Sequence, residues 1–254
     1  TAREFIRKEV VPREQEIADT DAIPEDIRKK AAAIGLFGYA IPQEWGGLGL
    51  DLTQDVELAM EFGYTSLALR SMFGTNNGIA GQVLVGFGTD EQKAQWLERI
   101  ASGDVVASFA LTEPGAGSNP AGLRTKAVLD GSDWVIDGNK RFITNAPLAQ
   151  LFVVFARTRP ADSDGPGIAV FLVPADTPGV TVGPKDKKMG QEGAWTSEVT
   201  FDNVRVPESA LVGGDQDTGY VATATVLLSP DNPFGRLALG ASREAALEAL
   251  ADWS

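Results

Sequence analysis

The apolar residues of this 254-residue chain change their spacing twice, which limits the folds that the chain can adopt. Up to about residue 103 they recur three and four positions apart, as on one face of a helix. Between 104 and 210 they fall in short runs typical of strands, and after Gly219 the helical spacing returns. We therefore predict an α+β fold with a helical N-terminal domain (1–104), a middle β-domain (105–214) and the first helices of an incomplete C-terminal helical domain (215–254).

Capping signals predict where the helices of the first region begin and end. Asp51 is a candidate N-cap for a helix over 52–62. Thr89 and Gln92 have the spacing of a capping box, in which each side chain bonds the backbone amide of the other residue. Gly103 suits the left-handed residue that ends the next helix. In all, we expect four to six helices before the β-domain.

Seven segments of the middle region are rich in β-branched and aromatic residues and are bounded by Gly, Pro, Asp or Asn. They are residues 105–113, 123–129, 133–144, 151–159, 168–175, 180–185 and 197–206. Because no helical segment separates them, we expect an antiparallel barrel or sandwich. The pair Asp137 and Gly138 predicts a type I′ hairpin, and the pair Asp130 and Gly131 predicts a second turn.

The chain contains no histidine and no cysteine, which excludes imidazole catalysis, thiolate nucleophiles, disulfides and iron–sulfur clusters. We predict no metal site. The net charge of −13, without clustered Lys and Arg, argues against a nucleic-acid partner. No apolar run approaches the roughly 18 residues of a membrane span, and the first ten residues lack a signal-peptide core. We therefore expect a soluble cytoplasmic protein.

The segment FALTEPGAGSNPAG, residues 109–122, follows the first expected strand. Its glycines, with Ser118 beside them, would let backbone amides approach an anion, and Thr112 adds a hydroxyl. From the glycine pattern alone, a surface turn is the favoured interpretation. A dinucleotide-binding GxGxxG motif is not supported, because Pro120 stands where the third glycine belongs.

The segment KRFITN, residues 140–145, places Phe142 and Thr144 on one face of a strand by simple alternation. Taken singly, this is typical of a strand core with a capping threonine. Glu113 is a conceivable general base, but a single carboxylate beside a proline is usually solvated or bonded to backbone amides.

Taken together, these segments resemble the acyl-CoA dehydrogenase family over nearly the whole chain. The matching stretches are PQEWGGLGL (42–50), GTDEQKAQWLERIASGD (88–104), FALTEPGAGSNPAGL (109–123), GNKRFITNA (138–146), DTPGV (176–180), KMGQEGAWTSEVTFDNVRVPESALVG (188–213) and GRLALGAS (235–242). Their order and spacing match as well. The Thr-Glu-Pro-Gly-Ala-Gly-Ser stretch followed by a Phe-Ile-Thr-Asn strand is specific to this family and related flavoproteins.

The resemblance implies that FAD lies between the middle domain and a C-terminal four-helix domain. It places Leu111 and Thr112 near the pyrimidine edge of the flavin, Ser118 toward the pyrophosphate and the CoA chain, Phe142 against the ring and Thr144 near flavin N5. The full set of implied cofactor residues is Phe109, Leu111, Thr112, Gly117, Ser118, Phe142, Ile143 and Thr144. The implied substrate-binding residues are Ser118 and Arg236.

The implied reaction converts an acyl-CoA thioester to the trans-2-enoyl-CoA: a carboxylate removes the α-proton while the β-hydrogen leaves as hydride to the flavin. Some subfamilies carry that carboxylate just before the arginine that Arg236 matches, but here the position is Gly235. Other subfamilies carry it later, so we expect the base beyond Ser254 and assign none within the chain. Pro233 stands where the family usually has Asp, and Asn119 replaces another common Asp.

The resemblance also implies partners and leaves two alternatives open. We expect an electron-transfer flavoprotein as acceptor, a homodimer or homotetramer, and a role in fatty acid metabolism. The alternatives are a flavin oxidase or monooxygenase of the same fold, and a non-catalytic partner subunit of a hetero-oligomeric acyl-CoA dehydrogenase. Leu247, Leu250 and Trp253 form an apolar stripe that would pack against further helices or another chain, so we expect residues 1–254 not to be self-sufficient.

Overall fold

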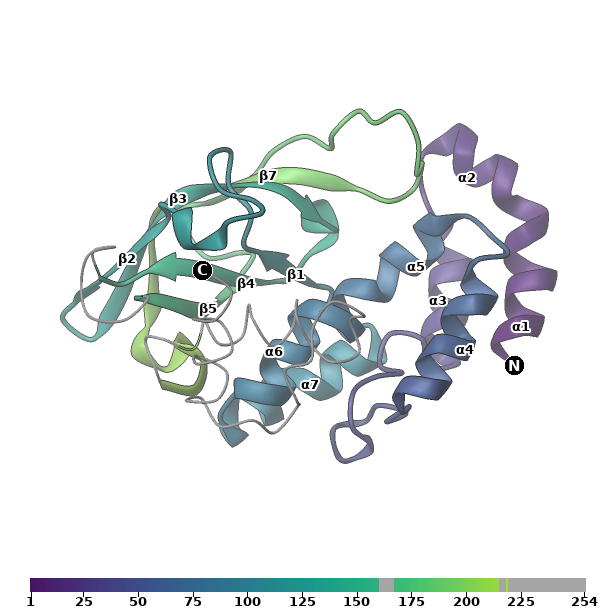
Figure 1. The fold of residues 1–254 in the computed structure, drawn as a ribbon, viewed down its shortest axis with the longest axis horizontal. Coiled ribbons are helices and arrows are strands. Elements are labelled where there is room, and N and C mark those ends of the chain that lie inside the picture. Colours follow the sequence, from purple (N-terminus) through teal and green to yellow (C-terminus); the bar gives the residue numbers. More distant parts are fainter. Residues whose placement is uncertain (160–166, 215–217, 219–254) are drawn as a thin grey trace.

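A helical region followed by a curled mixed β-sheet makes up the described part of this computed structural model, which comprises residues 1–159, 167–214 and 218 (Figure 1). This is the order that the change in apolar spacing predicts, and the fold class is confirmed. Arg236 and the stripe of Leu247, Leu250 and Trp253 lie outside the described residues. In the part of the chain that is described, no helix is long and apolar enough to span a membrane.

The helices of the N-terminal region follow one another closely. They are α1 (Ala2–Phe5), α2 (Glu14–Thr20), α3 (Glu25–Ala33), α4 (Leu52–Phe62), α5 (Leu67–Gly74), α6 (Ala80–Phe87) and α7 (Asp90–Ser102). A π-helical turn (Ile6–Val10) and a 3₁₀ turn (Val11–Arg13) join α1 to α2, and a π-helical turn (Thr75–Ile79) joins α5 to α6. If α1 with α2 and α5 with α6 are each counted as one helix, the described region agrees with the expected four to six helices.

The predicted caps are confirmed. Asp51 and Gln54 form a capping box at the start of α4, as Thr89 and Gln92 do at α7, and Gly103 ends α7 at a φ of +82°. Gln92 does more than cap, because its buried side-chain amide also donates to the Leu211 carbonyl. The capping residue therefore also ties α7 to the end of the β-region.

The sheet has seven strands in the described residues, and all seven expected segments form them. They are β1 (Ala107–Ala110), β2 (Lys126–Asp130), β3 (Asp133–Thr144), β4 (Leu151–Arg157), β5 (Ile168–Pro174), β6 (Val180–Val182) and β7 (Thr196–Pro207). The order is β1-β4-β2-β3-β7-β6, with β5 pairing with β4.

The sheet is mixed rather than purely antiparallel, which corrects one expectation. Strand β1 runs parallel to β4, and β2 meets β4 in parallel at Lys126 and Arg157. Parallel neighbours need a long crossover connection. Residues 111–150 provide one, because the glycine-rich loop and the β2–β3 hairpin lie between β1 and β4 in the chain.

Of the two predicted turns, one is confirmed and one is wrong. Asp130 pairs with Asp133 around Gly131, which has a φ of +68°, so β2 and β3 form a tight hairpin. Asp137 and Gly138 instead lie within β3, which pairs with β7 on both sides of them with a shift in register. Long-range pairing with β7 overrides the local turn signal, and the irregularity there is a bulge.

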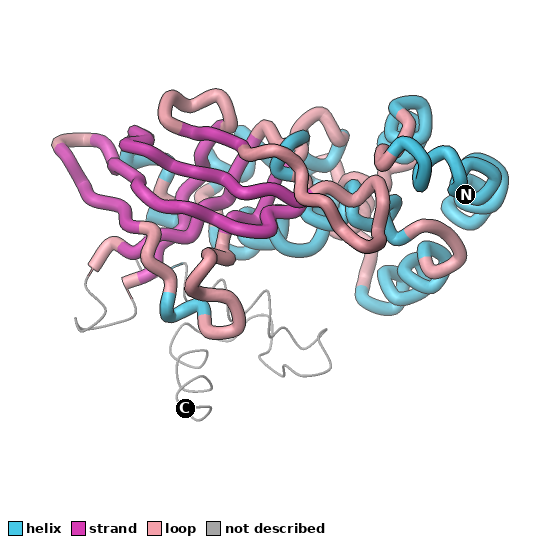
Figure 2. Tube along the Cα trace, turned by 90° about the horizontal axis from the view of Figure 1, so that it is seen from above, coloured by secondary structure: helices cyan, strands magenta, loops and turns pink. Residues whose placement is uncertain are grey.

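The two faces of the sheet bury separate cores. One face packs on α6 and α7, where residues such as Val153 and Phe155 meet Leu84 and Leu97. The other face curls onto itself around a second core that includes Phe171. Figure 2 shows helices behind the sheet and, beyond the sheet, a separate group of helices that contains the N-terminus.

Candidate functional site

The glycine-rich loop after β1 lies directly against the end of β3. The Thr112 carbonyl accepts a hydrogen bond from the Arg141 amide at 2.8 Å. Two further hydrogen bonds between the backbones of Glu113 and Ala116, at 2.9 and 3.2 Å, close a tight turn. The two segments that the sequence singles out, 109–118 and 142–144, are therefore brought together although some thirty positions separate them.

Within the loop, exposure rises toward its tip. Phe109 is half-buried, with its ring 4.7 Å from that of Phe155, and Leu111 is buried. Thr112 is half-buried, whereas Gly117 and Ser118 are exposed. A ligand that lies along the loop could therefore contact exposed backbone and a hydroxyl at Gly117 and Ser118, then the Thr112 hydroxyl, and finally the apolar residues where the loop begins.

Neither packing nor backbone conformation explains two of the loop's glycines, Gly115 and Gly117. A Cβ added at Gly115 or Gly117 would have no atom within 4 Å, and neither residue has a positive φ. A glycine that the fold itself does not require leaves room for something outside the fold to approach the backbone. The loop thus fits a ligand with an extended, anionic group.

The end of β3 carries an unusual backbone at Phe142. The pairing with β7 shifts in register between Lys140 and Ile143, and Phe142 has a φ of +58°. The residue is 60% exposed, and the Arg141 guanidinium lies 4.6 Å from the centre of its ring. A bulky residue in the left-handed region is costly and is found mainly where function needs it. The bulge thus presents an aromatic ring to the surface.

The bulge also decides how the neighbouring residues are oriented. Ile143 is 1% exposed and belongs to the inner core of the curled sheet, so its side chain cannot contact a ligand outside that core. Only its backbone could do so. Thr144 is half-buried, and its carbonyl accepts a hydrogen bond of 2.8 Å from the Ser108 hydroxyl.

A buried ion pair lies under the loop, and the sequence reasoning missed it. The Lys140 ammonium is 2.8 Å from the Glu113 carboxylate and 3.0 Å from the Leu111 carbonyl, and its side chain is fully buried. Burial alone would raise the pKa of Glu113, but the charge and hydrogen bond of Lys140, together with hydrogen bonds from Thr125 and from the Arg124 amide, lower it below its usual value. Burial, against the attraction of Glu113, lowers the pKa of Lys140 to about 8. The pair is therefore ionised at neutral pH.

A signal for the buried lysine was present in the sequence. Trp134 and Ile136 point inward on β3, and period-two alternation places Lys140 on that same face. Glu113, the carboxylate that matches it, lies in the motif already singled out. The solvated interpretation of Glu113 is thus wrong, and the backbone-bonded one is confirmed.

Asn145 fastens the end of β3 to the helical region. It adopts a left-handed φ of +62°, and its side-chain amide donates to the Ser71 carbonyl at 2.8 Å and to the Thr75 hydroxyl at 3.0 Å. Asn76, in the π-helical turn, bonds the carbonyls of Ile100 and Val105. Asn145 thus attaches the strand that carries Phe142 and Thr144 to α5 and the turn after it, whereas Asn76 attaches the segment that leads into β1.

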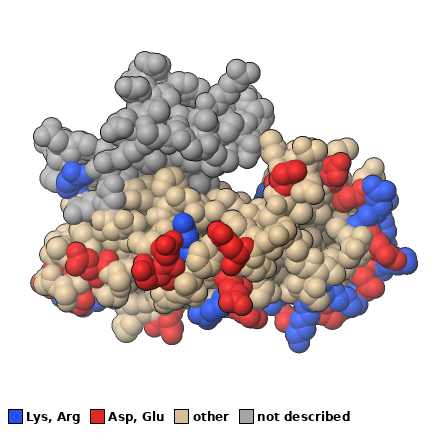
Figure 3. Space-filling model, turned by 90° about the horizontal axis from the view of Figure 1, so that it is seen from below, with Lys and Arg blue, Asp and Glu red and all other residues tan. Residues whose placement is uncertain are grey.

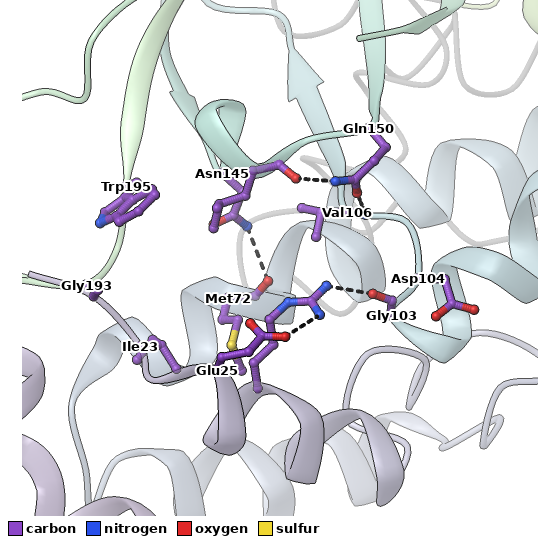
Figure 4. A pocket seen from close by; sticks show the side chains of 13 residues that line it. Ile23, Glu25, Met72, Gly103, Asp104, Val106, Asn145, Gln150, Gly193 and Trp195 are labelled. Carbon is purple, nitrogen blue, oxygen red and sulfur yellow. Dashed lines mark hydrogen bonds and ion pairs between the residues drawn. The ribbon is translucent and has the colours of Figure 1, made fainter. Parts of the chain in front are cut away.

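A cavity of about 540 Å³ opens between the helices and the sheet, beside Asn145. Figure 4 shows Trp195 on one wall, Glu25 and Met72 below, and Gln150 across from it. None of the implied cofactor residues lines it. Its polar side chains already have partners, such as Gln150 on the Val106 amide. We therefore base the candidate site on the loop and the bulge rather than on this cavity.

The described surface carries both signs of charge. On the face in Figure 3, acidic and basic side chains lie interspersed, most densely over the helical region, without a continuous basic patch among the described residues.

Comparison with known proteins finds one family over most of the chain. The family model "Acyl-CoA dehydrogenase, N-terminal domain" matches residues 1–104, and "Acyl-CoA dehydrogenase, middle domain" matches residues 108–204. An acyl-CoA dehydrogenase of Bacillus subtilis is 36% identical over 99% of this chain and 66% of its own length. The chain spans 66% of the length of that relative and 38% of the length of a probable acyl-CoA dehydrogenase of the same organism, which is also 36% identical.

Two solved structures show the same architecture. A glutaryl-CoA dehydrogenase from Mycobacterium smegmatis, in complex with FADH2, superimposes with a TM-score of 0.81 at 34% identity, over 89% of this chain and 56% of that one. A prolyl acyl carrier protein oxidase, AnaB, superimposes with a TM-score of 0.76 at 29% identity, over 82% and 56%. The fold is thus shared by proteins named for different chemistries.

Proposed function

Because the chain belongs to the acyl-CoA dehydrogenase family, we propose that it is part of an FAD-dependent oxidoreductase that converts an acyl-CoA thioester to the trans-2-enoyl-CoA. FAD is the cofactor of the family, and it supplies the acceptor for the hydride that leaves the β-carbon. The observation that carries the proposal is the contact between the glycine-rich loop and the bulged end of β3, joined by the Arg141 amide and the Thr112 carbonyl.

The residues present fit such a cofactor. The open backbone around Gly117 and the Ser118 hydroxyl would bind the pyrophosphate, because amides and hydroxyls can surround an anion there without steric conflict. Leu111 and Thr112 would lie at the pyrimidine edge. The exposed Phe142 ring would cover the isoalloxazine, and the Thr144 hydroxyl would donate toward N5. For Ile143 the proposal is limited to backbone contact, since its side chain is buried.

The proposal assigns no general base to a described residue. Glu113 is held by Lys140 and two backbone amides, and its lowered pKa makes it a poor proton acceptor. We propose that the catalytic carboxylate lies outside the described residues. Arg236 remains a proposed substrate contact, together with Ser118.

We further propose the division into 1–104, 105–214 and 215–254, with the last segment opening a C-terminal helical domain. An acyl-CoA substrate, an electron-transfer flavoprotein as acceptor, a homo-oligomer and a role in fatty acid metabolism extend the proposal to the whole protein. These rest on family membership alone.

One alternative function is supported by a specific comparison. The similarity to a prolyl acyl carrier protein oxidase suggests a flavin oxidase that passes electrons to oxygen. Reducing the flavin anaerobically with an acyl-CoA and then admitting oxygen separates the two. A dehydrogenase should reoxidise slowly without an added acceptor flavoprotein, whereas rapid reoxidation with peroxide formation would favour the oxidase.

The experiment that tests the proposed site is Thr144→Val in the whole polypeptide. Reduction of the flavin by a good acyl-CoA substrate should slow while FAD stays bound. Unchanged reduction kinetics would remove Thr144 from the site.

A further inference from the structure

The glycine-rich loop is closed at its base by a single buried carboxylate. Glu113 precedes the loop, and its two oxygens accept hydrogen bonds from the amides of Arg124 at 2.6 Å and Thr125 at 2.9 Å, which follow the loop. Residues 114–123 therefore leave and re-enter the fold at one point. Glu113 as a whole residue is only 7% exposed.

Lys140 fixes that closure to the strand that carries Phe142 and Thr144. Its ammonium donates both to the Glu113 carboxylate and to the Leu111 carbonyl. The next residue, Arg141, donates its amide to the Thr112 carbonyl. Lys140 and Arg141 thus bind three successive residues that lead into the loop: the carbonyls of Leu111 and Thr112 and the carboxylate of Glu113.

A fully buried ion pair is a poor way to gain stability, because the cost of taking both charges out of water largely offsets their attraction. Apolar side chains of similar volume would stabilise the core at least equally well. The pair does supply directional bonds to several backbone groups at once, which apolar residues cannot do. This points to a role in fixing geometry.

We infer that Lys140 and Glu113 are a positioning pair that holds the base of the 114–123 loop against β3, so that Thr112, Gly117 and Ser118 face the same ligand as Phe142 and Thr144. The inference rests on the proposed function, because it takes that ligand to be FAD. Neither residue touches the reacting atoms; both act through the backbone that they bind.

The test uses three variants in the whole polypeptide: Lys140→Met, Glu113→Gln and the double variant. Each single variant leaves one charge buried without its partner, so the apoprotein should lose stability. The double variant leaves neither charge, so its apoprotein should fold and regain much of the lost stability. Ile27→Ala, in the core of the helical region, which is separate from the core that contains Leu111, is the control for a loss of stability alone.

The readouts are the FAD dissociation constant of each apoprotein, measured where all variants are folded, and the midpoint potential of the bound flavin. We expect the dissociation constant to rise at least about tenfold in both single variants, and to stay raised in the double variant although its stability recovers. The potential should shift in all three. Ile27→Ala should change neither property.

Two results overturn the inference and leave the proposed function intact. If the dissociation constant follows stability, and so returns to the wild-type value in the double variant, the pair is structural only. If wild type binds FAD tightly and the single variants bind it equally well, the pair does not position the loop. If wild type itself binds no FAD, the proposed function fails first, and the inference falls with it.

Discussion

The backbone amide of Arg141 donates to the carbonyl of Thr112 at 2.8 Å, and this bond joins the two segments on which the proposed flavin site depends. On one side lies a glycine-rich turn with open backbone, and on the other a bulge that exposes an aromatic ring. The bond is independent of side-chain identity. Substitutions at Thr144 or Gly117 should therefore change the site without moving its frame.

Thr144→Val tests the hydroxyl at the end of β3. The loss of one hydrogen bond, worth about 0.5–1.5 kcal/mol, should slow flavin reduction by about 2-fold to 10-fold at saturating substrate. Rapid-mixing absorbance measures that rate. Thr181→Val, on the exposed face of β6, is the matched control and should leave it unchanged. Equal rates in both variants would count against the role of Thr144.

Gly117→Leu tests whether the loop backbone must remain open. Nothing lies within 4 Å of an added Cβ, so the fold should tolerate the side chain. The FAD dissociation constant should nevertheless rise at least about tenfold, because the leucine occupies the space that the cofactor needs. Gly86→Leu in α6, where an added Cβ also meets nothing within 4 Å, is the control. Unaltered FAD binding by Gly117→Leu would place the cofactor elsewhere.

The buried lysine predicts a dependence of stability on pH. Burial, opposed by the attraction of Glu113, lowers the pKa of Lys140 from 10.5 to about 8. The unfolded chain retains the ordinary value, so between these pH values it binds more protons than the folded chain, and stability rises with pH. Relative to the double variant of Lys140→Met and Glu113→Gln, the free energy of unfolding should rise by up to about 1.4 kcal/mol per pH unit between pH about 8 and 10.5. A constant or falling difference would contradict the assignment.

Asn76→Leu tests the link between the helices and the sheet. The buried amide bonds the carbonyls of Ile100 and Val105 and accepts from the Ala107 amide at 2.9 Å. The substitution leaves three buried backbone groups without this partner. The free energy of unfolding, measured with urea, should therefore fall by about 2–4 kcal/mol. Asn139→Leu, exposed on β3, should stay within about 0.5 kcal/mol of wild type. Similar losses in the two variants would contradict the role of Asn76.

Local signals predicted most of the fold. Capping side chains at Asp51 and Thr89 and the glycine at 103 act within a few residues, so their outcomes depend little on the rest of the chain. The turn at Asp137 and Gly138 failed for the opposite reason: β7, some sixty positions later, pairs along β3 and holds it extended. The parallel pairing of β1 with β4 likewise depends on a distant partner.

The candidate site was predictable in its residue types and not in its geometry. The motif around Thr112 and Ser118 stands out by composition. The bulge that turns Phe142 outward and Ile143 inward has no local signature, since it arises from the register with β7. Alternation alone would have placed Lys140 in the interior, but identifying its partner requires the loop to fold back onto the strand.

Anaerobic titration of the FAD-loaded whole polypeptide with acyl-CoA thioesters of increasing chain length tests the central claim most directly. The account predicts stoichiometric loss of the oxidised-flavin absorbance with at least one of them, together with formation of the corresponding enoyl-CoA. A protein that binds FAD tightly but keeps its flavin oxidised with every thioester, although dithionite reduces it, would contradict the claim that this chain is part of an acyl-CoA dehydrogenase.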